Sequence, residues 1–216
     1  MYITEIKEIS KSKSLISIDG EVAFALYKGD LRLYKIEQGK QISREIYDEL
    51  ISNVLVKRAK LRCMHLLKSR AYTETQLRTK LRASYYPSKI IEEALQYVKS
   101  FHYVDDKQYC EDYVSYNISK LSRQAIIHKL QEKGIDKALI LSVYDEVLLQ
   151  NADGNDVNGN ASGCERRQIQ EWLHKKSFDI ENADNKEINR MVSFLVRKGY
   201  QYNDIRVVMR LYENND

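Results

Sequence analysis

The sequence predicts a mainly α-helical protein made of tandem three-helix-bundle repeats, winged-helix-like units without the wing, behind a small N-terminal β-hairpin and a helix. One pattern carries this prediction: a leucine-spaced helix, a tight turn and a second apolar-striped helix. Residues 78–95 align with residues 127–144 without a gap, and the turn and last helix return at residues 192–209. Because a small bundle buries little alone, repetition of this kind indicates stacked copies of one module.

The N-terminal residues have a strand pattern. Residues 2–9 and 15–18 alternate in polarity, and Asp19-Gly20 joins the second run to residues 21–27, which is a strong hairpin signal. Glycines predict turns at Lys28-Gly29-Asp30 and Gln38-Gly39-Lys40. Ser43 is then expected to cap a helix that runs on toward Lys57.

The repeat predicts the domain divisions and the helices. The divisions are 1–56 for the hairpin and helix, 57–104 for the first repeat, 105–150 for the second, 151–164 for a flexible linker and 165–216 for the third. The expected helices are 57–70, 73–83 and 87–100, then 105–119, 122–133 and 136–150, and last 165–176, 184–198 and 203–213. The linker is rich in Asn, Asp and Gly, which predicts a flexible connection.

Helix ends are marked by local signals. Thr73 with Gln76 and Asp184 with Glu187 have capping-box spacing, Ser122 is equivalent to Thr73, and Pro87 fits a first helical turn. Gly134 and Gly199 occupy the turn where a helix end favours a left-handed residue, and the first copy has Tyr85 there. The third copy is the weakest, with Asp204 at a position that is apolar in the others.

The charge distribution suggests a binding surface. Lys and Arg total 35 against 31 Asp and Glu, yet residues 57–82 contain nine basic residues and a single acidic one, Glu74. Such clusters attract phosphates or acidic protein surfaces, although a solvated helix face is the alternative interpretation. The candidate contact residues are Lys57, Arg58, Lys60, Arg62, Lys68, Arg70, Arg78, Lys80 and Arg82, together with Tyr85 and Tyr86 as candidates for base stacking.

Motifs for catalysis, metal binding or membrane insertion are missing from the sequence. We find no His or Cys ligand pair, no glycine-rich phosphate loop and no nucleophile with a base, so we expect no enzyme, no catalytic residue, no metal and no cofactor. The acidic residues of 151–163 lack calcium-loop spacing. Three cysteines without C-x-x-C spacing, no signal peptide and no long apolar run predict a cytoplasmic protein without membrane contact.

Three motifs resemble the RecX regulatory proteins. Residues 58–67 and 72–81 are similar to the first repeat of that family, and residues 101–109, Phe-His-Tyr-Val-Asp-Asp-Lys-Gln-Tyr, are similar to its most recognisable motif. The likeness spans nearly the whole chain. His102 and Tyr85 depart from it, since each stands where glycine is usual, and the 151–164 linker is longer than the family pattern.

The resemblance implies a non-enzymatic regulator that lies in the groove of the RecA recombinase filament on DNA. Such proteins usually inhibit its ATPase and strand exchange, and so regulate DNA repair, homologous recombination and the SOS response. The implied partners are the RecA filament and, weakly and with salt sensitivity, single- or double-stranded DNA. From the charges we add an expectation of an elongated, positively charged monomer.

Two other functions stay open at this stage. A helix-turn-helix-like transcriptional regulator would place helix 87–100 in the major groove, but this helix offers Lys89 and Lys99 against Glu92 and Glu93, and no arginine for guanine. A structural adaptor without DNA contact would fail to bind DNA even at low salt.

Overall fold

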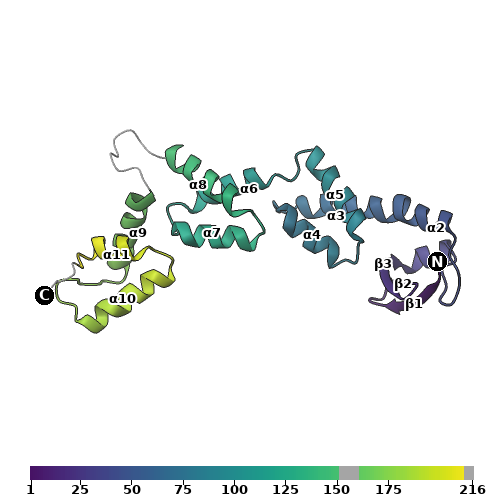
Figure 1. The fold of residues 1–216 in the computed structure, drawn as a ribbon, viewed down its shortest axis with the longest axis horizontal. Helices are drawn as coiled ribbons and strands as arrows, with labels where there is room; N and C mark the ends of the chain where they lie inside the picture. Colours follow the sequence, from purple (N-terminus) through teal and green to yellow (C-terminus); the bar gives the residue numbers. More distant parts are fainter. Residues whose placement is uncertain (151–160, 212–216) are drawn as a thin grey trace. The chain divides into compact units, whose positions relative to one another are not determined.

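The computed structural model describes residues 1–150 and 161–211 (Figure 1). The chain divides into two units, Met1–Asp105 and Asp106–Asp216. The predicted class is confirmed, because the chain is mostly helical with one small antiparallel sheet at the N-terminus. Within the described ranges, no helix combines the length and the apolar character needed to cross a membrane.

The sheet has three strands in the order β1-β2-β3: β1 (Ile3–Glu8), β2 (Lys13–Ile18) and β3 (Glu21–Tyr27). The hairpin prediction is confirmed, since β2 and β3 are antiparallel and join at Asp19 and Gly20, which have φ of 50° and 91°. Positive φ at both central positions suits the right-handed twist of the flanking strands. Alternate side chains of the sheet are buried: Ile3, Ile16, Phe24 and Leu26.

A short helix, α1 (Lys28–Leu33), follows β3 directly, so the prediction of a turn at residues 28–30 is wrong. Asp30 explains the helix, because its side chain accepts the Tyr27 N–H at 2.9 Å and caps the first turn. The turn at residues 38–40 is confirmed, with Gly39 at φ 79° and the Lys40 N–H donated to the Glu37 carbonyl.

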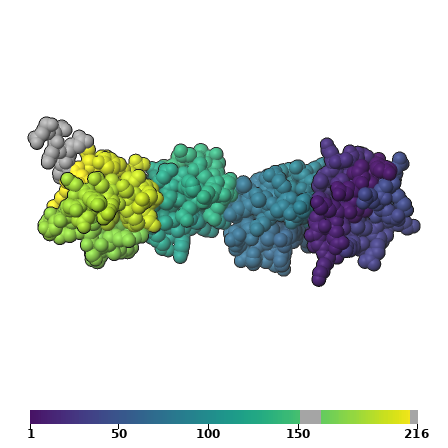
Figure 2. All heavy atoms as spheres, turned by 90° about the horizontal axis from the view of Figure 1, so that it is seen from below, coloured from purple at the N-terminus to yellow at the C-terminus, as the bar shows by residue number. Residues whose placement is uncertain are grey.

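The next helical run is continuous: α2 (Arg44–Glu49), the π-helical segment η1 (Leu50–Val56) and α3 (Lys57–Leu67). Ser43 caps it as predicted, accepting the Ile46 N–H at 3.3 Å. The expected division at residues 56 and 57 therefore falls inside one helical run. One buried core joins the sheet to this run, and the space-filling view shows them in direct contact (Figure 2).

The first repeat is completed by α4 (Glu74–Arg82) and α5 (Ser88–Ser100). The capping box is confirmed: Thr73 Oγ1 accepts the Gln76 N–H at 3.2 Å, and Gln76 Oε1 accepts the Thr73 N–H at 3.3 Å. Pro87 precedes the first residue of α5 as its N-cap and does not lie within the first turn, a shift of one residue.

The second unit contains the other two repeats. They comprise α6 (Asp106–Asn117), α7 (Arg123–Glu132) and α8 (Lys137–Gln150), then α9 (Ala161–Lys175), α10 (Asn185–Arg197) and α11 (Tyr202–Val208). Because α9 begins at Ala161, the last part of the predicted 151–164 linker is helical, and residues 151–160 lie outside the described residues. Helix α11 ends before the predicted Glu213, which also lies outside them.

The three tight turns share one backbone geometry, which supports the repeat. Tyr85, Gly134 and Gly199 have φ of 63°, 83° and 91°. In each copy the next N–H is donated back to the preceding helix, from Tyr86 to Leu81, from Ile135 to Leu130 and from Tyr200 to Leu195, at 3.1–3.3 Å. This is the Schellman arrangement that ends a helix at a left-handed residue.

Polar contacts join the second and third repeats inside the second unit. Ser122 Oγ donates to the Lys198 carbonyl at 2.8 Å, and the buried Glu165 accepts the Arg123 N–H at 2.8 Å. Within the third repeat, Asp204, buried where the other copies are apolar, accepts Arg166 Nε at 2.8 Å and joins α11 to α9. Side chains of the two repeats touch in the space-filling view (Figure 2), and the contacts of Ser122 and Glu165 hold the start of α7 against the third repeat. The flexibility of the linker stays a prediction.

Candidate interaction surface

The basic residues of 57–82 fall into two groups, and the first group is paired inside the first unit. Arg58 Nη1 and Nη2 lie 2.5 and 2.8 Å from the Asp30 carboxylate, and Lys60 Nζ lies 2.8 Å from Glu93 Oε1. Glu74 therefore does not offset this segment alone, because acidic residues distant in the sequence reach it.

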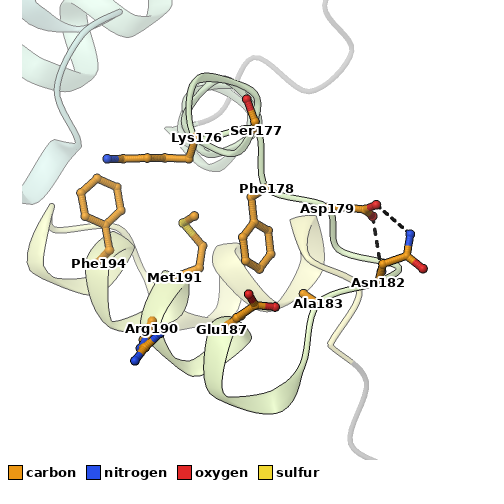
Figure 3. Close-up of a pocket in the computed structure, with 10 residues that line it drawn as sticks. All are labelled: Lys176, Ser177, Phe178, Asp179, Asn182, Ala183, Glu187, Arg190, Met191 and Phe194. Carbon is orange, nitrogen blue, oxygen red and sulfur yellow. Dashed lines mark hydrogen bonds between the residues drawn. The ribbon is translucent and has the colours of Figure 1, made fainter.

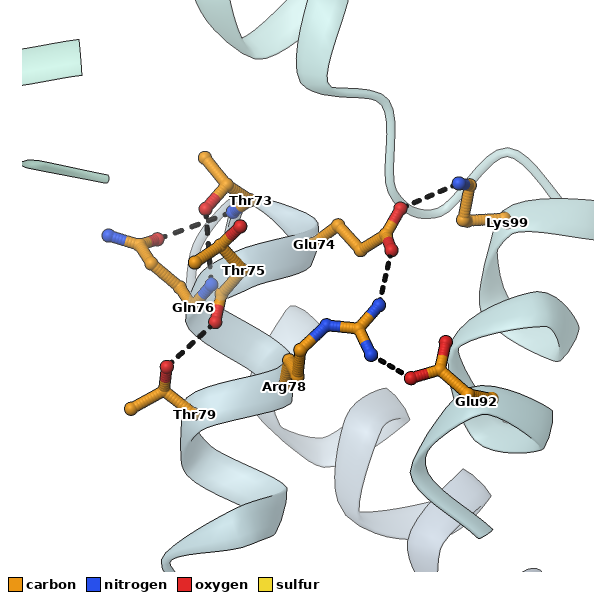
Figure 4. Close-up of polar contacts among 8 residues, drawn as sticks. All are labelled: Thr73, Glu74, Thr75, Gln76, Arg78, Thr79, Glu92 and Lys99. Carbon is orange, nitrogen blue, oxygen red and sulfur yellow. Dashed lines mark hydrogen bonds and ion pairs between the residues drawn. The ribbon is translucent and has the colours of Figure 1, made fainter. Parts of the chain in front are cut away.

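Arg78 is held most completely (Figure 4). Its guanidinium bridges Glu74, at 2.6 Å in the next helical turn, and Glu92 of α5. Glu74 also accepts Lys99 Nζ at 2.6 Å, and this bond to Lys99, together with the Arg78 bond, outweighs burial and lowers the pKa of the Glu74 carboxyl. Arg78 thus fastens α4 to α5, and its charge is compensated within the first unit.

The pairing of Arg58 with Asp30 is partly buried. Burial opposes ionisation of Asp30, but the Arg58 hydrogen bond and the Tyr27 N–H outweigh it and lower the pKa of this carboxyl. The same bond raises the pKa of Arg58. The guanidinium carbon also lies 4.8 Å from the centre of the Tyr27 ring, so Arg58 fixes α3 against the end of β3.

The second group is exposed. Lys57, Arg62, Lys68, Arg70, Lys80 and Arg82 face solvent, and none of them forms an ion pair with the residues the structure describes. Arg70 is placed 4.5 Å over the Tyr72 ring. Tyr85 is 43% exposed at its turn, while Tyr86 is more buried and packs against the core of the first unit.

Two of the candidate cations and one candidate tyrosine meet in a groove of about 550 Å³. It lies between the β2–β3 hairpin, α3 and the turn before α5. The groove is lined by Lys13, Tyr27, Arg58, Leu61, Arg62, His65, Ser84 and Tyr86. The other predicted contact residues, Lys57, Lys60, Lys68, Arg70, Arg78, Lys80, Arg82 and Tyr85, do not line it.

The groove combines positive charge with apolar and aromatic surface. No carboxylate lines it, and Lys13 Nζ lies 4.8 Å over the Tyr27 ring. Leu61 is 68% exposed at its edge. Burial raises the pKa of the Cys63 thiol, in the core of the first unit, to about 11, so this cysteine is an unreactive core residue. Such a surface suits a phosphate beside a flat base, or a protein carboxylate beside an apolar side chain.

Five lining residues were not among the sequence candidates: Lys13, Tyr27, Leu61, His65 and Ser84. Lys13 and Tyr27 are paired across β2 and β3, which places both beside α3 only after the sheet has folded onto the helix. Leu61 and His65 share one face of α3 with Arg58 and Arg62, at positions i, i+3, i+4 and i+7. That spacing was the one available signal.

Helix α5 is poorly suited to read bases. Glu92, Glu93 and Lys99 are engaged in ion pairs with Arg78, Lys60 and Glu74. Three of its charged side chains are therefore engaged inside the first repeat, and Lys89 alone among the four charges named above has no such pair in the part of the chain that the structure describes, which argues against the transcription-regulator alternative. Among the described residues, no group of His, Cys, Asp and Glu side chains is arranged to hold a metal ion.

The chain matches two family models: RecX, first three-helix domain, over residues 59–97, and RecX, second three-helix domain, over residues 105–143. The chain belongs to the RecX family. Its similar relatives named Regulatory protein RecX include one from Caldanaerobacter subterraneus, 29% identical over 85% of this chain and 97% of the relative. Another, from Clostridium acetobutylicum, is 26% identical over 99% of this chain and 98% of the relative.

Solved structures of RecX proteins show the same fold. One crystal structure of regulatory protein RecX has a TM-score of 0.58 and 18% identity, with 97% of this chain and 98% of that one covered. The RecX crystal structure from Lactobacillus salivarius has a TM-score of 0.54 and 18% identity, with 73% of this chain and 96% of that one covered.

Proposed function

We propose that this RecX-family regulatory protein binds the RecA–DNA nucleoprotein filament in the cytoplasm and lowers its ATPase and strand-exchange activity, without catalysing a reaction itself. The match to both RecX three-helix domains carries the proposal. Through the filament it would regulate DNA repair and recombination.

The groove of the first unit is the proposed contact surface. It gathers Lys13, Arg58 and Arg62 around Tyr27 and Tyr86 without a lining carboxylate, so its potential favours an anionic partner. Because Arg58 is already paired with Asp30, we assign most of the attraction to Lys13 and Arg62. Bare DNA would be bound weakly through phosphates, with a strong dependence on salt.

The first test is the DNA-dependent ATPase of the cognate RecA with this protein at substoichiometric amounts. We expect the rate to fall as the protein is added, since a bound protein obstructs the groove and alters subunit packing. An unchanged rate across the full titration would remove the regulator proposal.

The groove is tested by a double charge reversal. Lys13→Glu with Arg62→Glu is expected to raise the amount needed for half-inhibition at least tenfold. The matched control is Lys68→Glu with Lys80→Glu, which makes the same change of charge at exposed positions outside the groove. If the control loses as much inhibition as the groove variant, binding depends on the total positive charge of the first unit, and the groove assignment is wrong.

A further inference from the structure

The third repeat contains a hollow that the sequence did not indicate (Figure 3). It has a volume of about 510 Å³ and lies between the end of α9 with its following loop and one side of α10. Three apolar side chains form its wall, Phe178 from the loop and Met191 and Phe194 from α10. All three are half-buried and pack against the third-repeat core, so the hollow presents an apolar surface that is open to solvent.

The charged side chains around this hollow differ in whether residues of the same segment hold them. Its two carboxylates keep their charge and are held by neutral donors of their own segment: Asp179 accepts the Asn182 side chain at 2.7 Å and the Glu181 N–H at 3.0 Å, and Glu187 accepts the Asp184 N–H at 3.1 Å. The two cations, Lys176 and Arg190, form no ion pair with any residue in the described part of the chain. The hollow itself is thus lined by two cations and two carboxylates, and only the carboxylates are held by hydrogen bonds from their own segment.

Neighbouring residues add positive charge beside the hollow. Lys176 Nζ and Lys198 Nζ lie 5.3 and 5.6 Å from the centre of the Phe194 ring. On the other side of Arg190, a shallow depression along α10 has no lining carboxylate, and it is lined by Asn185, Lys186, Asn189, Arg190, Ser193 and Arg197. Cations thus border the apolar hollow along two directions.

We propose that this hollow is a docking site for an acidic segment of a partner protein, which inserts one bulky apolar side chain between Phe178, Met191 and Phe194. Charge complementarity selects the acidic flanks, and the apolar wall selects the anchor. Binding grooves for peptides commonly combine one buried anchor with a polar rim, and a flexible methionine adapts to the shape of the anchor. The rings of Phe178 and Phe194 line the side of the hollow and pack against the core, so they do not offer a flat open face. This arrangement favours an inserted side chain over a stacked nucleobase.

The site can be tested with the purified full-length protein and a synthetic peptide in which one phenylalanine is flanked by glutamates. Trp172 is the only tryptophan and packs edge-on against Phe194, with ring centres 5.3 Å apart, so its fluorescence reports occupancy. We expect a saturable change with this peptide. A peptide of glutamates alone and a peptide with lysine flanks should each bind at least tenfold more weakly.

Charge reversal separates the site from general attraction. Lys176→Glu with Arg190→Glu changes two exposed side chains and should weaken binding of the peptide at least tenfold. Lys129→Glu with Lys137→Glu makes an equal change on exposed positions of the second repeat and should leave binding within twofold.

Equal weakening by both variants would overturn the proposal, as would a lack of saturable peptide binding or tighter binding of a thymidine oligonucleotide. The RecA ATPase is not used in this test, so its outcome does not depend on the proposed function.

Discussion

In each unit a buried carboxylate on one helix bonds to a second helix, and we call this contact a joint. The two joints differ in the group that stabilises the negative charge of the carboxylate. In the first unit, the Arg58 guanidinium holds Asp30 through two hydrogen bonds. In the second unit, Glu165 accepts the backbone N–H of Arg123 at the start of α7, while the guanidinium of that arginine is 3.0 Å from Asp145.

The difference appears in the pKa values. The pKa of Asp30 is lowered because hydrogen bonds from Arg58 and Tyr27 outweigh burial. Burial raises the pKa of Glu165, and the nearby Asp204 adds to this, against the Arg123 N–H. A full positive charge therefore stabilises a buried carboxylate where a single N–H at a helix start does not.

The joints also differ at their tight turns. Gly199 ends α10 against the start of α7, and a Cβ there would lie 2.6 Å from Ser122 Oγ and 3.3 Å from the Ala125 nitrogen. The equivalent Tyr85 of the first repeat is 43% exposed. A left-handed position that nothing covers can carry a tyrosine, whereas a covered one needs glycine.

The largest effect is expected from Gly199→Ala, which breaks the joint of the second unit. The added methyl group clashes with Ser122, and alanine at this position must adopt a left-handed φ of 91°. We therefore expect a loss of roughly 2–4 kcal/mol in the free energy of unfolding. Urea unfolding followed by the fluorescence of Trp172, which lies in this unit, measures it.

Gly20→Ala is the matched control, because Gly20 has the same φ of 91° and a Cβ added there would meet no atom within 4 Å. It should cost the first unit about 1 kcal/mol, from backbone strain alone, measured by urea unfolding followed by circular dichroism because Trp172 lies in the other unit. Equal losses for the two variants would mean that the contact of Gly199 with Ser122 contributes nothing.

The sequence predicted the helix caps and turns, which depend on residues close together in the chain. The capping residues Thr73, Ser122 and Asp184 and the turn at Gly199 act within a few residues, and the structure has each of them at the expected place. The repeats were also predicted, because the spacing of their apolar residues is visible within short stretches of sequence.

Contacts between distant residues were not predictable in this way. Arg58 and Lys60 looked free because their partners, Asp30 and Glu93, lie 28 and 33 residues away. The helix at residues 28–33 was missed for two reasons. Gly29 favoured a turn and the local cap from Asp30 to the Tyr27 N–H was overlooked, and the pair of Asp30 with Arg58 is distant in the sequence. The groove could not be predicted either, because it forms only when the sheet packs on α3 and brings Tyr27 beside that helix.

The pH dependence of stability sharpens the comparison of the two joints. Because the folded pKa of Asp30 is lowered, its contribution is present above the unfolded value near 3.8 and is lost as pH falls through the folded pKa. Because the folded pKa of Glu165 is raised, its contribution is present below about 4.5 and is lost as pH rises through the folded pKa.

Neutral variants should therefore have opposite effects near pH 7. Asp30→Asn should lower the free energy of unfolding of the first unit, and the difference from the parent should vanish at low pH. Glu165→Gln should raise that of the second unit, with the gain growing as pH rises. Hydrogen exchange in α3 and α7 across pH reports each joint separately, and effects of the same sign would contradict the comparison.

The smallest effect is expected at Tyr85, where the first repeat departs from the glycine of the other two. Tyr85→Gly removes a left-handed side chain with φ 63°, and little buried surface is lost, so we expect a gain of about 0.5–1 kcal/mol in the first unit. Tyr85→Ala removes the ring but keeps Cβ and should give no gain. Urea unfolding followed by circular dichroism measures both, and a glycine variant less stable than the alanine variant would show that the left-handed turn is not a source of strain.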